Sequence, residues 1–335
     1  MTLDLDTFLT ALYSIVDDLY QKHYAPLKPK RPGRNPDLSD SEVLTLILCA
    51  QWYGRSQRAF MRYAAEHWQR YFPRLLSQSA CNRRSRDLTG VLTHMVARVA
   101  QDMHAYLAPY QAIDTVPVPL MRRRRGRRRR LFGPEAAIGR GGCDRDWYYG
   151  CKLLLAATPQ GACTGFVLAP ANTEDRWLAE AFLCWRHDVD QHPVRPDEMP
   201  RRRNGRAYVG PSGPLGLRHG VGEMSAGPYV ADNGFFGSWW QGHWRAHYRA
   251  SVLTPRDYGG SGGRTGRRRH AGWRQIVETI NGHLEQVFGL HFPGARSLWG
   301  LQSRIAAKLV ALNLGIWLNR HFGRPDLAFA TLFNG

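Results

Sequence analysis

The sequence predicts an α/β protein in which an all-helical N-terminal region precedes a mixed sheet covered by helices on both faces. Two features of the 335-residue chain support this prediction. Apolar residues recur at helical spacing through roughly the first hundred residues. From Tyr110 onward, short strand-like runs come first and then alternate with helical segments. A chain of this length can bury a sizeable core and can form two or three domains.

Amphipathic patterns predict the helices of the N-terminal region. The first pattern covers residues 3–20, where leucines and other apolar side chains share one helical face. Ser39, followed three residues later by Glu42, has the form of a capping box that opens a largely buried helix. Further helical patterns run from Ser56 to Tyr71 and from residue 88 to residue 103.

The second part of the chain is expected to contain five strands. Three strand-like runs come first, and helical and strand-like segments then alternate up to a long final helix. This order of β, β, β, α, β, α, β, α is that of the ribonuclease-H-like fold, a mixed five-stranded sheet with helices on both faces. The expected strands are 110–118, 147–158, 161–170, 228–232 and 250–255, and the expected helices are 175–187, 238–249 and 273–288, the last preceded by a basic glycine-rich loop.

These patterns divide the chain into three parts. We expect residues 1–108 to form a helical N-terminal region and residues 109–292 to form the ribonuclease-H-like domain, with basic insertions near 121–130 and 188–228. Residues 293–335 form a C-terminal helical segment that we expect to pack on the core.

The charge of the chain favours nucleic acid as its partner. The formal net charge is +19, and three runs carry most of it: eight arginines in 122–130, four in 201–206 and four in 264–269. Basic patches of this kind bind polyanions by releasing condensed counterions. A membrane is the rival partner, but no stretch reaches the roughly 18 apolar residues that a span requires. The N-terminus is acidic and does not resemble a signal peptide, so we expect a cytoplasmic protein.

The cysteines suggest no metal site. The six cysteines include no C-x-x-C pair and no histidine at zinc-site spacing. We therefore interpret them as reduced thiols that act as small buried hydrophobic residues.

Three acids fall at comparable places in the predicted sheet. Asp114 lies on the first strand, Asp232 ends the fourth, and Glu278 lies on the late helix. The first and fourth strands of a ribonuclease-H-like sheet are neighbours, so the two aspartates can approach each other. Clustered carboxylates repel unless cations neutralise them, and Mg²⁺ prefers such oxygen ligands. The pattern therefore predicts Mg²⁺ or Mn²⁺, with two ions roughly 3.5–4 Å apart serving a displacement at phosphorus.

Each acid also has a plainer interpretation. Asp114 can accept backbone hydrogen bonds at a strand end, and Asp232 in Asp-Asn-Gly has the form of a tight turn. Glu278 can be a solvated helix residue that pairs with Arg274 four positions earlier. Glu285, seven residues further on, lies on nearly the same helical face, so helix geometry alone does not choose between the two glutamates.

At these residues the chain resembles the Asp-Asp-Glu (DDE) transposases of bacterial insertion sequences, and most closely the family of insertion sequence 982. The resemblance covers nearly the whole chain. In the N-terminal region it is carried by DLSDSEVLTLILCA, RAFMRY, YFPRLL and CNRR. In the core it is carried by AIDTVPVPL, YYGCKLLL, ANTEDRWL, VADNGF and RQIVETINGHLEQVFGL.

The resemblance implies a function and a set of roles. Asp114, Asp232 and Glu278 would bind the metal ions and cleave the phosphodiester at each element end, and the freed 3′ hydroxyl would then attack the target strand. The R-x-x-x-E spacing of Arg274 and Glu278 favours Glu278 over Glu285. Arg274 would orient Glu278 or contact phosphate, and Lys152 would contact DNA. The implied partners are element-end and target DNA, bound by a homo-oligomer that we expect to be a dimer.

The sequence departs from the family pattern at three positions. Asn233 stands where such transposases often have a basic residue, Leu154 replaces a frequent histidine, and Glu285 stands where related families carry lysine. These departures leave two alternatives open beside an active transposase. One is a catalytically inactive DNA-binding relic, and the other is a metal-dependent nuclease without strand transfer.

Further residues are candidates for DNA contacts. For Arg83 and Arg84, which we expect at the start of a helix with Arg86, a contact with the element end and a solvated surface turn are both open. Trp239, Trp240 and Trp244 follow the second aspartate at helical spacing, which is more typical of core residues than of base-stacking platforms. The arginines expected to contact DNA within the basic runs are Arg122, Arg123, Arg124, Arg125, Arg267, Arg268 and Arg269.

The arginine runs predict a steep dependence of DNA affinity on salt. Each phosphate that an arginine neutralises releases counterions, so the logarithm of the binding constant should fall linearly with the logarithm of salt concentration. Fluorescence anisotropy with labelled duplex DNA over a salt series measures this slope. An affinity that does not change with salt concentration would show that the arginine runs do not contact the DNA.

Overall fold

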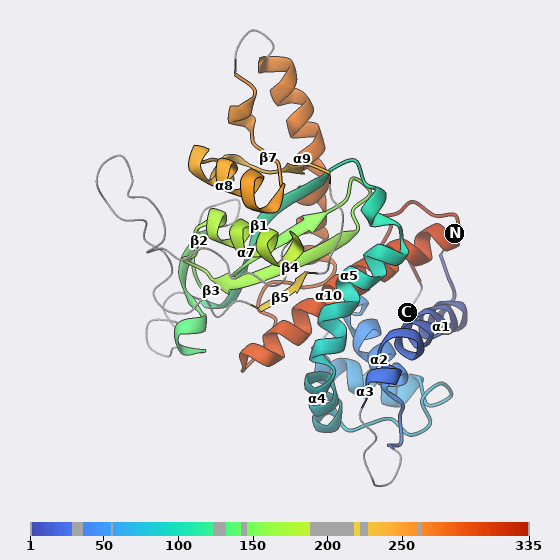
Figure 1. The fold of residues 1–335 in the computed structure, drawn as a ribbon. Coiled ribbons are helices and arrows are strands. Elements are labelled where there is room, and N and C mark those ends of the chain that lie inside the picture. Colours follow the sequence, from blue (N-terminus) through green and yellow to red (C-terminus); the bar gives the residue numbers. More distant parts are fainter. Residues whose placement is uncertain are drawn as a thin grey trace.

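The computed structural model describes residues 2–28, 36–54, 56–122, 132–141, 146–187, 218–221, 227–259 and 263–333. Within these ranges the chain is a mixed α/β protein with a helical N-terminal region, as the sequence predicts (Figure 1). The N-terminal helices are α1 Leu5–His23, α2 Asp40–Trp52, α3 Gln57–His67, α4 Gln78–Asp87 and α5 Thr89–Asp102, with short 3₁₀ turns at Ala25–Leu27 and Ala105–Leu107.

The starts of the N-terminal helices follow from local sequence. The capping box of α2 is present: Ser39 Oγ accepts from the Glu42 N–H, and the Glu42 carboxylate accepts from the Ser39 N–H. Ser56 and Ser77 cap α3 and α4 through the same type of serine contact. The cap at Ser77 begins α4 several residues earlier than expected. Arg83 and Arg84 therefore lie in the second half of that helix and not at its start.

The sheet has more strands than the five predicted. Its order is β5-β4-β3-β1-β6-β7, and β2 pairs with β3 beside this path. The pairs β1–β3, β3–β4 and β4–β5 are antiparallel, whereas β6 runs parallel to β1 and β7 runs parallel to β6. The strands are β1 Gln111–Arg122, β2 Ala137–Gly141, β3 Asp146–Ala157, β4 Cys163–Pro170, β5 Arg218–Val221, β6 Tyr229–Val230 and β7 Val252–Leu253.

The two unexpected strands, β2 and β5, correct the five-stranded prediction. The sequence of β2, AIGRG, contains two glycines, which usually weaken strand propensity. Gly139 is nevertheless required, because a Cβ atom at this position would lie 2.4 Å from the Ala171 carbonyl oxygen. Glycine therefore marks a close approach of two backbones here. The other unexpected strand, β5, lies in the segment expected to be a long basic insertion.

Helices cover both faces of the sheet (Figure 1). Alternation along β3 shows the two faces directly: Leu153 and Leu155 belong to one buried cluster, and Leu154 and Ala156 belong to the other. The second cluster contains α7 and α8, whereas the first joins the sheet to α9, α10 and the N-terminal helices. The bounds are α7 Asp175–His187, α8 Ser238–Tyr248, α9 Gly263–Gln286 and α10 Leu298–His321, with 3₁₀ turns at Gly133–Glu135, Asn233–Phe235 and Pro255–Asp257.

The start of α9 differs from the prediction. The helix begins at Gly263, ten residues before the expected start at Trp273, so the basic segment expected to be a loop is helical. Arg267, Arg268 and Arg269 are exposed on its first turns. In Figure 1, this end of α9 extends beyond the sheet. The helix therefore carries a basic end and, further along, the predicted glutamate.

Lys308 and Asn313 interrupt the apolar stretch 305–318 of α10, and both have partners. Asn313 Nδ2 donates to the carbonyls of Val96 (3.0 Å) and Cys163 (2.8 Å), and its Oδ1 accepts from the Cys163 N–H (2.8 Å). Lys308 donates to Gln51 Oε1 and to the Phe288 carbonyl, and burial lowers its pKa to about 8. The C-terminal helix is thereby fastened to the N-terminal helices and to the sheet. In the described part of the chain, no helix is both long enough and apolar enough to cross a membrane.

The cysteines behave as small hydrophobic residues wherever the structure describes them. Cys49, Cys81, Cys151, Cys163 and Cys184 are all buried and form no disulfide bond. Cys143 lies outside the described residues.

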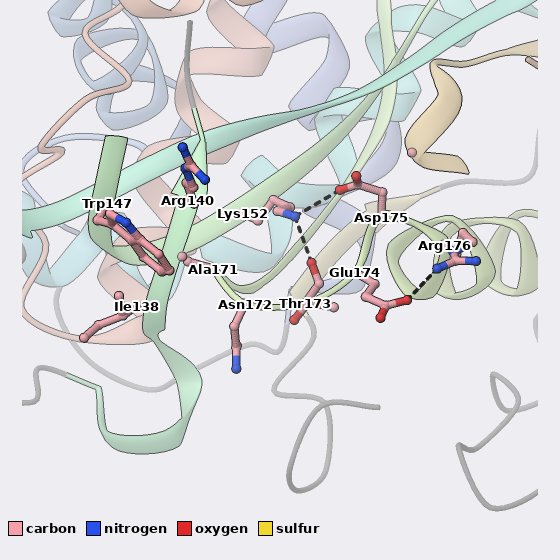
Figure 2. Close-up of a pocket in the computed structure, with 12 residues that line it drawn as sticks. Ile138, Arg140, Trp147, Lys152, Ala171, Asn172, Thr173, Glu174, Asp175 and Arg176 are labelled. Carbon is pink, nitrogen blue, oxygen red and sulfur yellow. Dashed lines mark hydrogen bonds and ion pairs between the residues drawn. The ribbon is translucent and has the colours of Figure 1, made fainter. Parts of the chain in front are cut away.

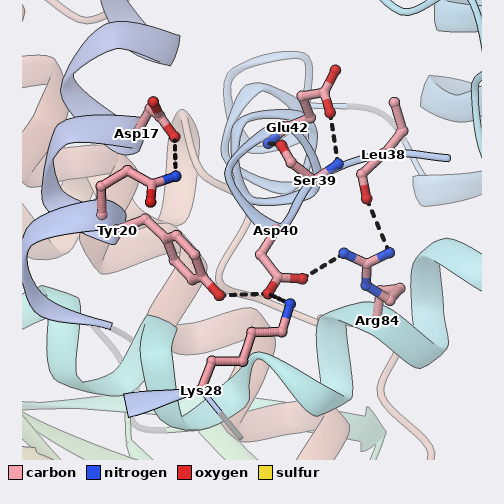
Figure 3. A network of polar contacts seen from close by, with 9 residues as sticks. Asp17, Tyr20, Lys28, Leu38, Ser39, Asp40, Glu42 and Arg84 are labelled. Atoms are coloured by element: carbon pink, nitrogen blue, oxygen red, sulfur yellow. Dashed lines mark hydrogen bonds and ion pairs between the residues drawn. The ribbon is translucent and has the colours of Figure 1, made fainter. Parts of the chain in front are cut away.

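A buried carboxylate joins three segments of the N-terminal region (Figure 3). Asp40, at the first position of α2, accepts hydrogen bonds from Tyr20 on α1, from Lys28 and from Arg84 on α4. Burial by itself raises the pKa of Asp40, but these hydrogen bonds outweigh it and hold the pKa below its ordinary value. Arg84 also donates to the Leu38 carbonyl and is only 20% exposed. Its guanidinium therefore has an internal role.

Asp40→Asn should destabilise the protein by about 2–4 kcal/mol, because it leaves Arg84 without its charge partner. Asp37→Asn is the matched control, since Asp37 pairs with Arg74 where both side chains are well exposed, and it should cost less than about 1 kcal/mol. Urea unfolding at neutral pH measures both. The stabilisation by the Asp40 network should be present above the ordinary aspartate pKa and should disappear as pH falls through the lowered one. Equal effects of the two substitutions would contradict the proposed weight of this network.

Candidate functional site

The two predicted aspartates lie at matching positions on neighbouring parallel strands. Gln111 and Ala112 of β1 pair with Tyr229 and Val230 of β6. Asp114 follows Ala112 by two residues, and Asp232 follows Val230 by two residues, so the register brings the two acids to the same level of the sheet. The electrostatic interaction between the two carboxylates is consistent with this placement. Sequence reasoning therefore predicted this neighbourhood correctly.

Local backbone groups hold both carboxylates. The Thr115 N–H donates to Asp114 Oδ1 at 2.8 Å, and the Gly234 N–H donates to Asp232 Oδ1 at 2.8 Å. Asp232 also caps the 3₁₀ turn Asn233–Phe235. The turn interpretation of Asp232 and its place beside Asp114 are thus both correct, because the turn fixes the carboxylate at the end of β6.

One face of α9 contacts both strands. His270 Nε2 lies 2.8 Å from the Ala231 carbonyl, directly before Asp232, and Asn281 Nδ2 donates to Asp114 Oδ2 at 3.3 Å. His270 is buried, and this burial lowers the pKa of its imidazole, although the hydrogen bond to Ala231 opposes the change. The helix is therefore anchored near the start of β1 and directly after β6.

The predicted glutamate is linked to Asp114 through Arg274. The same guanidinium nitrogen lies 3.8 Å from Asp114 Oδ2 and 3.4 Å from Glu278 Oε1. Arg274 is 18% exposed, whereas Glu278 is 49% exposed. Glu285 instead lies 3.2 Å from His291. The geometry therefore associates Glu278 and not Glu285 with the aspartates, and the positive charge between Asp114 and Glu278 belongs to Arg274.

Asp175, at the first position of α7, belongs to the same site but was not among the predicted site residues. Its Oδ1 accepts from Lys152 Nζ at 3.0 Å (Figure 2). The same oxygen also accepts from Thr115 Oγ1 at 3.0 Å. A Cβ atom on Gly234 would lie 2.7 Å from Asp175 Oδ2 and 2.9 Å from Asp232 Oδ1. The two carboxylates therefore flank Gly234. An acid in the first turn of a helix has an ordinary explanation in the helix dipole, which concealed this role in the sequence.

Burial, together with the neighbouring acids, makes Asp114 difficult to ionise. Burial raises the pKa of Asp114 to about 7, and repulsion from Asp232 and Asp175 acts in the same direction. Arg274 and the Thr115 N–H oppose the rise. Negative charge at this end of the sheet is thus only partly compensated by the protein itself.

The donor set fits a magnesium-type ion only in part. Among the described residues, no group of three or more His, Cys, Asp and Glu side chains is close enough to hold a metal. Mg²⁺ does not require such a cage, because it typically takes one or two carboxylates and completes its shell with waters and substrate phosphates. Asp114 and Asp232 meet that requirement in chemical type and position. Glu278 is held by Arg274 and does not complete a three-acid group in this structure.

The residues predicted to contact DNA have different environments. Arg83, Arg122, Arg267, Arg268 and Arg269 are exposed, whereas Arg84 pairs internally with Asp40. Arg123, Arg124 and Arg125 lie outside the described residues. These DNA contacts stay predictions.

Lys152, also predicted to contact DNA, is directed inward. Its ammonium group donates to the Thr173 carbonyl at 2.9 Å as well as to Asp175, and its side chain is 17% exposed. The exposure leaves limited access for a phosphate.

The tryptophans of α8 are mainly core residues. Trp240 and Trp244 are buried in the cluster that covers one face of the sheet. Trp244 Nε1 donates to the fully buried Glu180 of α7 at 2.9 Å, and Tyr248 donates to the same carboxylate at 2.7 Å. Trp239 is partly buried and stacks on His243. These contacts fasten α8 to α7.

Comparisons with known proteins add no identity: no family model, no curated protein and no solved structure matches this chain. The geometry of the acids and of the basic residues is therefore the basis for a function.

Asp114→Asn should stabilise the metal-free protein at pH 8 and stabilise it less at pH 5. The folded state raises the pKa of Asp114 to about 7, so its ionisation destabilises the fold as pH rises from the ordinary aspartate range through 7. We expect a gain of about 1–3 kcal/mol at pH 8, since one pKa unit corresponds to about 1.4 kcal/mol and partial solvent access reduces the effect. Urea unfolding in EDTA at both pH values measures it. A loss of stability at pH 8 would show that Arg274 outweighs burial.

Proposed function

We propose that this protein is a metal-dependent DNA transposase of the DDE class, which cuts the ends of an insertion sequence and joins them to target DNA. One observation carries the proposal: Asp114 and Asp232 stand at matching register positions on adjacent parallel strands, beside the helix that carries Arg274 and Glu278. Paired acids at one end of a sheet are suited to a divalent cation and to a phosphate that the cation binds.

The strand order supports a ribonuclease-H-like core for this function. Among β1, β3, β4, β6 and β7, the first three are antiparallel neighbours, and β6 and β7 join parallel to β1 on its other side. The expected order of β, β, β, α, β, α, β, α has the same connections. On this proposal, β2 and β5 are additions to the common core.

Asp114, Asp232 and Glu278 would hold Mg²⁺ or Mn²⁺, with two ions in the working site. Bound ions of this type activate a nucleophilic oxygen and stabilise the leaving oxygen at phosphorus. An added cation would favour the ionised form of Asp114, whose pKa is raised by burial.

The remaining side chains position and balance the acids. Arg274 lies between Asp114 and Glu278, and its positive charge balances part of the negative charge of the two carboxylates. Asn281 and the Thr115 N–H orient the Asp114 carboxylate, and Lys152 balances Asp175. Arg274 is also close enough to the acids to contact a phosphate bound there.

The exposed arginines support DNA as the partner. Arg267, Arg268 and Arg269 lie on the same helix as Glu278, so DNA that contacts the start of α9 would be guided toward the acids. The N-terminal helices, with Arg83 exposed on α4, would read the element end. A dimer in the bacterial cytoplasm, associated with the nucleoid when DNA is bound, would bring two ends together.

A catalytically inactive DNA-binding relic is the second candidate. The observation that favours it is the Arg274–Glu278 pair, which leaves no three-acid group among the described residues. The departures at Asn233, Leu154 and Glu285 point the same way. A nuclease without strand transfer would share the site and differ only in its products.

Cleavage of DNA that carries the gene with its flanking sequence tests the proposal. A supercoiled plasmid with this insert should be nicked at the element ends in Mg²⁺ and not in EDTA, and joined products should appear on a target plasmid. Glu278→Gln and Asp232→Asn should lower the rate by more than about 100-fold, beyond the roughly 10–100-fold typical of a supporting residue.

Glu285→Gln is the matched control, because Glu285 lies on the same helix but pairs with His291. It should retain cleavage within a few-fold. Equal loss in the two glutamine variants would contradict the assignment of Glu278. Binding without any cleavage by the unmodified protein would favour the relic, and nicks without joined products would favour the nuclease.

A further inference from the structure

A pocket of about 420 Å³ opens beside the acids, between the β2–β3 hairpin and the segment that leads from β4 to α7 (Figure 2). This volume falls within the roughly 300–1,000 Å³ of small-molecule sites in proteins. Its lining includes Arg140, Trp147, Lys152, Asn172, Thr173 and Asp175.

An indole and a guanidinium form one wall of the pocket. Trp147 on β3 and Arg140 on β2 are paired opposite each other in the antiparallel register, so their side chains leave the same face of the hairpin. Trp147 is 51% exposed, which is unusual for so large an apolar side chain. A half-exposed ring beside a cation is a surface on which a flat aromatic ligand can stack.

The opposite wall is polar and includes a hydroxyl with an unmet hydrogen bond. Thr173 is 3% exposed, and its Oγ1 has no hydrogen-bond partner within the described ranges. Asn172 beside it is exposed and carries an amide that can both donate and accept. A buried hydroxyl without a hydrogen bond lowers the stability of the fold by about 1–3 kcal/mol. A ligand that forms this hydrogen bond would account for the presence of the hydroxyl.

The pocket is continuous with the acid site. Lys152, Asp175 and Gly234 line the pocket, and Asp175 and Gly234 also contact the surroundings of Asp232. The Lys152 ammonium lies between the two regions, held by the Thr173 carbonyl and the Asp175 carboxylate. If a ligand binds in the pocket, the chemical groups attached to it would therefore lie next to the acids.

We propose that this pocket binds one unpaired nucleobase of the DNA strand, next to the phosphate that the acids bind. The inference rests on the proposed function, since the acids give the phosphate its place. Stacking on Trp147 suits any base, Asn172 and Thr173 present donors and acceptors to a base edge, and Arg140 brings positive charge near the strand. The pocket accommodates a base only after it leaves the duplex, so the site favours single-stranded or unpaired DNA near the cut.

Trp147, and not the tryptophans of α8, is therefore the base-stacking residue. Trp240 and Trp244 are covered by α7, whereas Trp147 borders an open pocket. Trp299 on α10 is 53% exposed and does not line the pocket, so it serves as a matched control for the loss of an exposed indole.

Fluorescence anisotropy in EDTA tests the pocket without any cleavage. The probes are a labelled single-stranded oligothymidine and a labelled duplex of equal length. Trp147→Ala should weaken single-strand binding about 5- to 150-fold, the range that corresponds to 1–3 kcal/mol for one stacked base, and change duplex binding less than twofold. Trp147→Phe should keep most of the affinity, and Trp299→Ala should change neither probe.

Thr173→Val gives a second, independent measurement. Valine keeps the shape and removes the unpaired hydroxyl, so the melting temperature should stay the same or rise while single-strand affinity falls several-fold. A residue with a purely structural role would instead lose stability and keep its affinity.

The outcomes separate the two proposals. Unchanged single-strand affinity in Trp147→Ala, or an equal loss on both probes, would overturn the base pocket and leave the transposase proposal intact. If the unmodified protein shows no Mg²⁺-dependent cleavage but Trp147→Ala still weakens single-strand binding, the transposase proposal alone is overturned. An unmodified protein that binds neither probe would overturn both.

Discussion

The parallel pairing of β1 with β6 is the contact on which the candidate site depends. β6 has only two paired residues, yet Tyr229 and Ala231 donate to the carbonyls of Ser251 and Leu253, directly before and in β7. Gln111 of β1 donates to the Pro228 carbonyl. A slip of one residue in this pairing would turn the acid of one strand to the other face of the sheet. His270 fixes the same point from α9 by its contact with the Ala231 carbonyl. Register, more than any property of the separate acids, therefore creates the site.

The second constraint is charge. Four acids lie at or near one end of the sheet, and the cations closest to them, Arg274 and Lys152, are each shared with a second group. Repulsion and burial together raise the pKa of Asp114, so the metal-free site is under electrostatic strain that an added cation would relieve. Under the proposed function, a bound phosphate would add further negative charge and would need both the cation and the surrounding arginines of this strongly basic protein.

Sequence patterns predicted the framework of this fold but not its finer contacts. Serine caps and apolar periodicity placed α2 and α7 closely, because those signals are local. The strand β2 was missed because glycine usually marks the absence of a strand, whereas at Gly139 it permits a close approach to Ala171. The start of α9 was placed too late, since arginines and glycines gave no apolar face to recognise.

The candidate site shows the same limit. Asp114 and Asp232 could be expected from their places on the first strand and at the end of the fourth, and the choice of Glu278 needed a resemblance or the contact with Arg274. Asp175 and the partnership of Arg84 with Asp40 depend on residues far apart in the chain, so no local pattern contains them. The pocket beside Trp147 likewise arises from two segments that meet only in the folded protein.

The single hydrophobic cluster shared by the N-terminal helices, α10 and one face of the sheet has a mechanical consequence. A helical region joined to the sheet by a flexible linker could bind DNA in many orientations. A helical region that shares its hydrophobic core with the sheet keeps one orientation relative to it. Asn313, which ties α5, β4 and α10 together, makes that union tighter. If the N-terminal helices bind DNA, the distance between the bound bases and the bond that is cut is fixed by the structure of the protein.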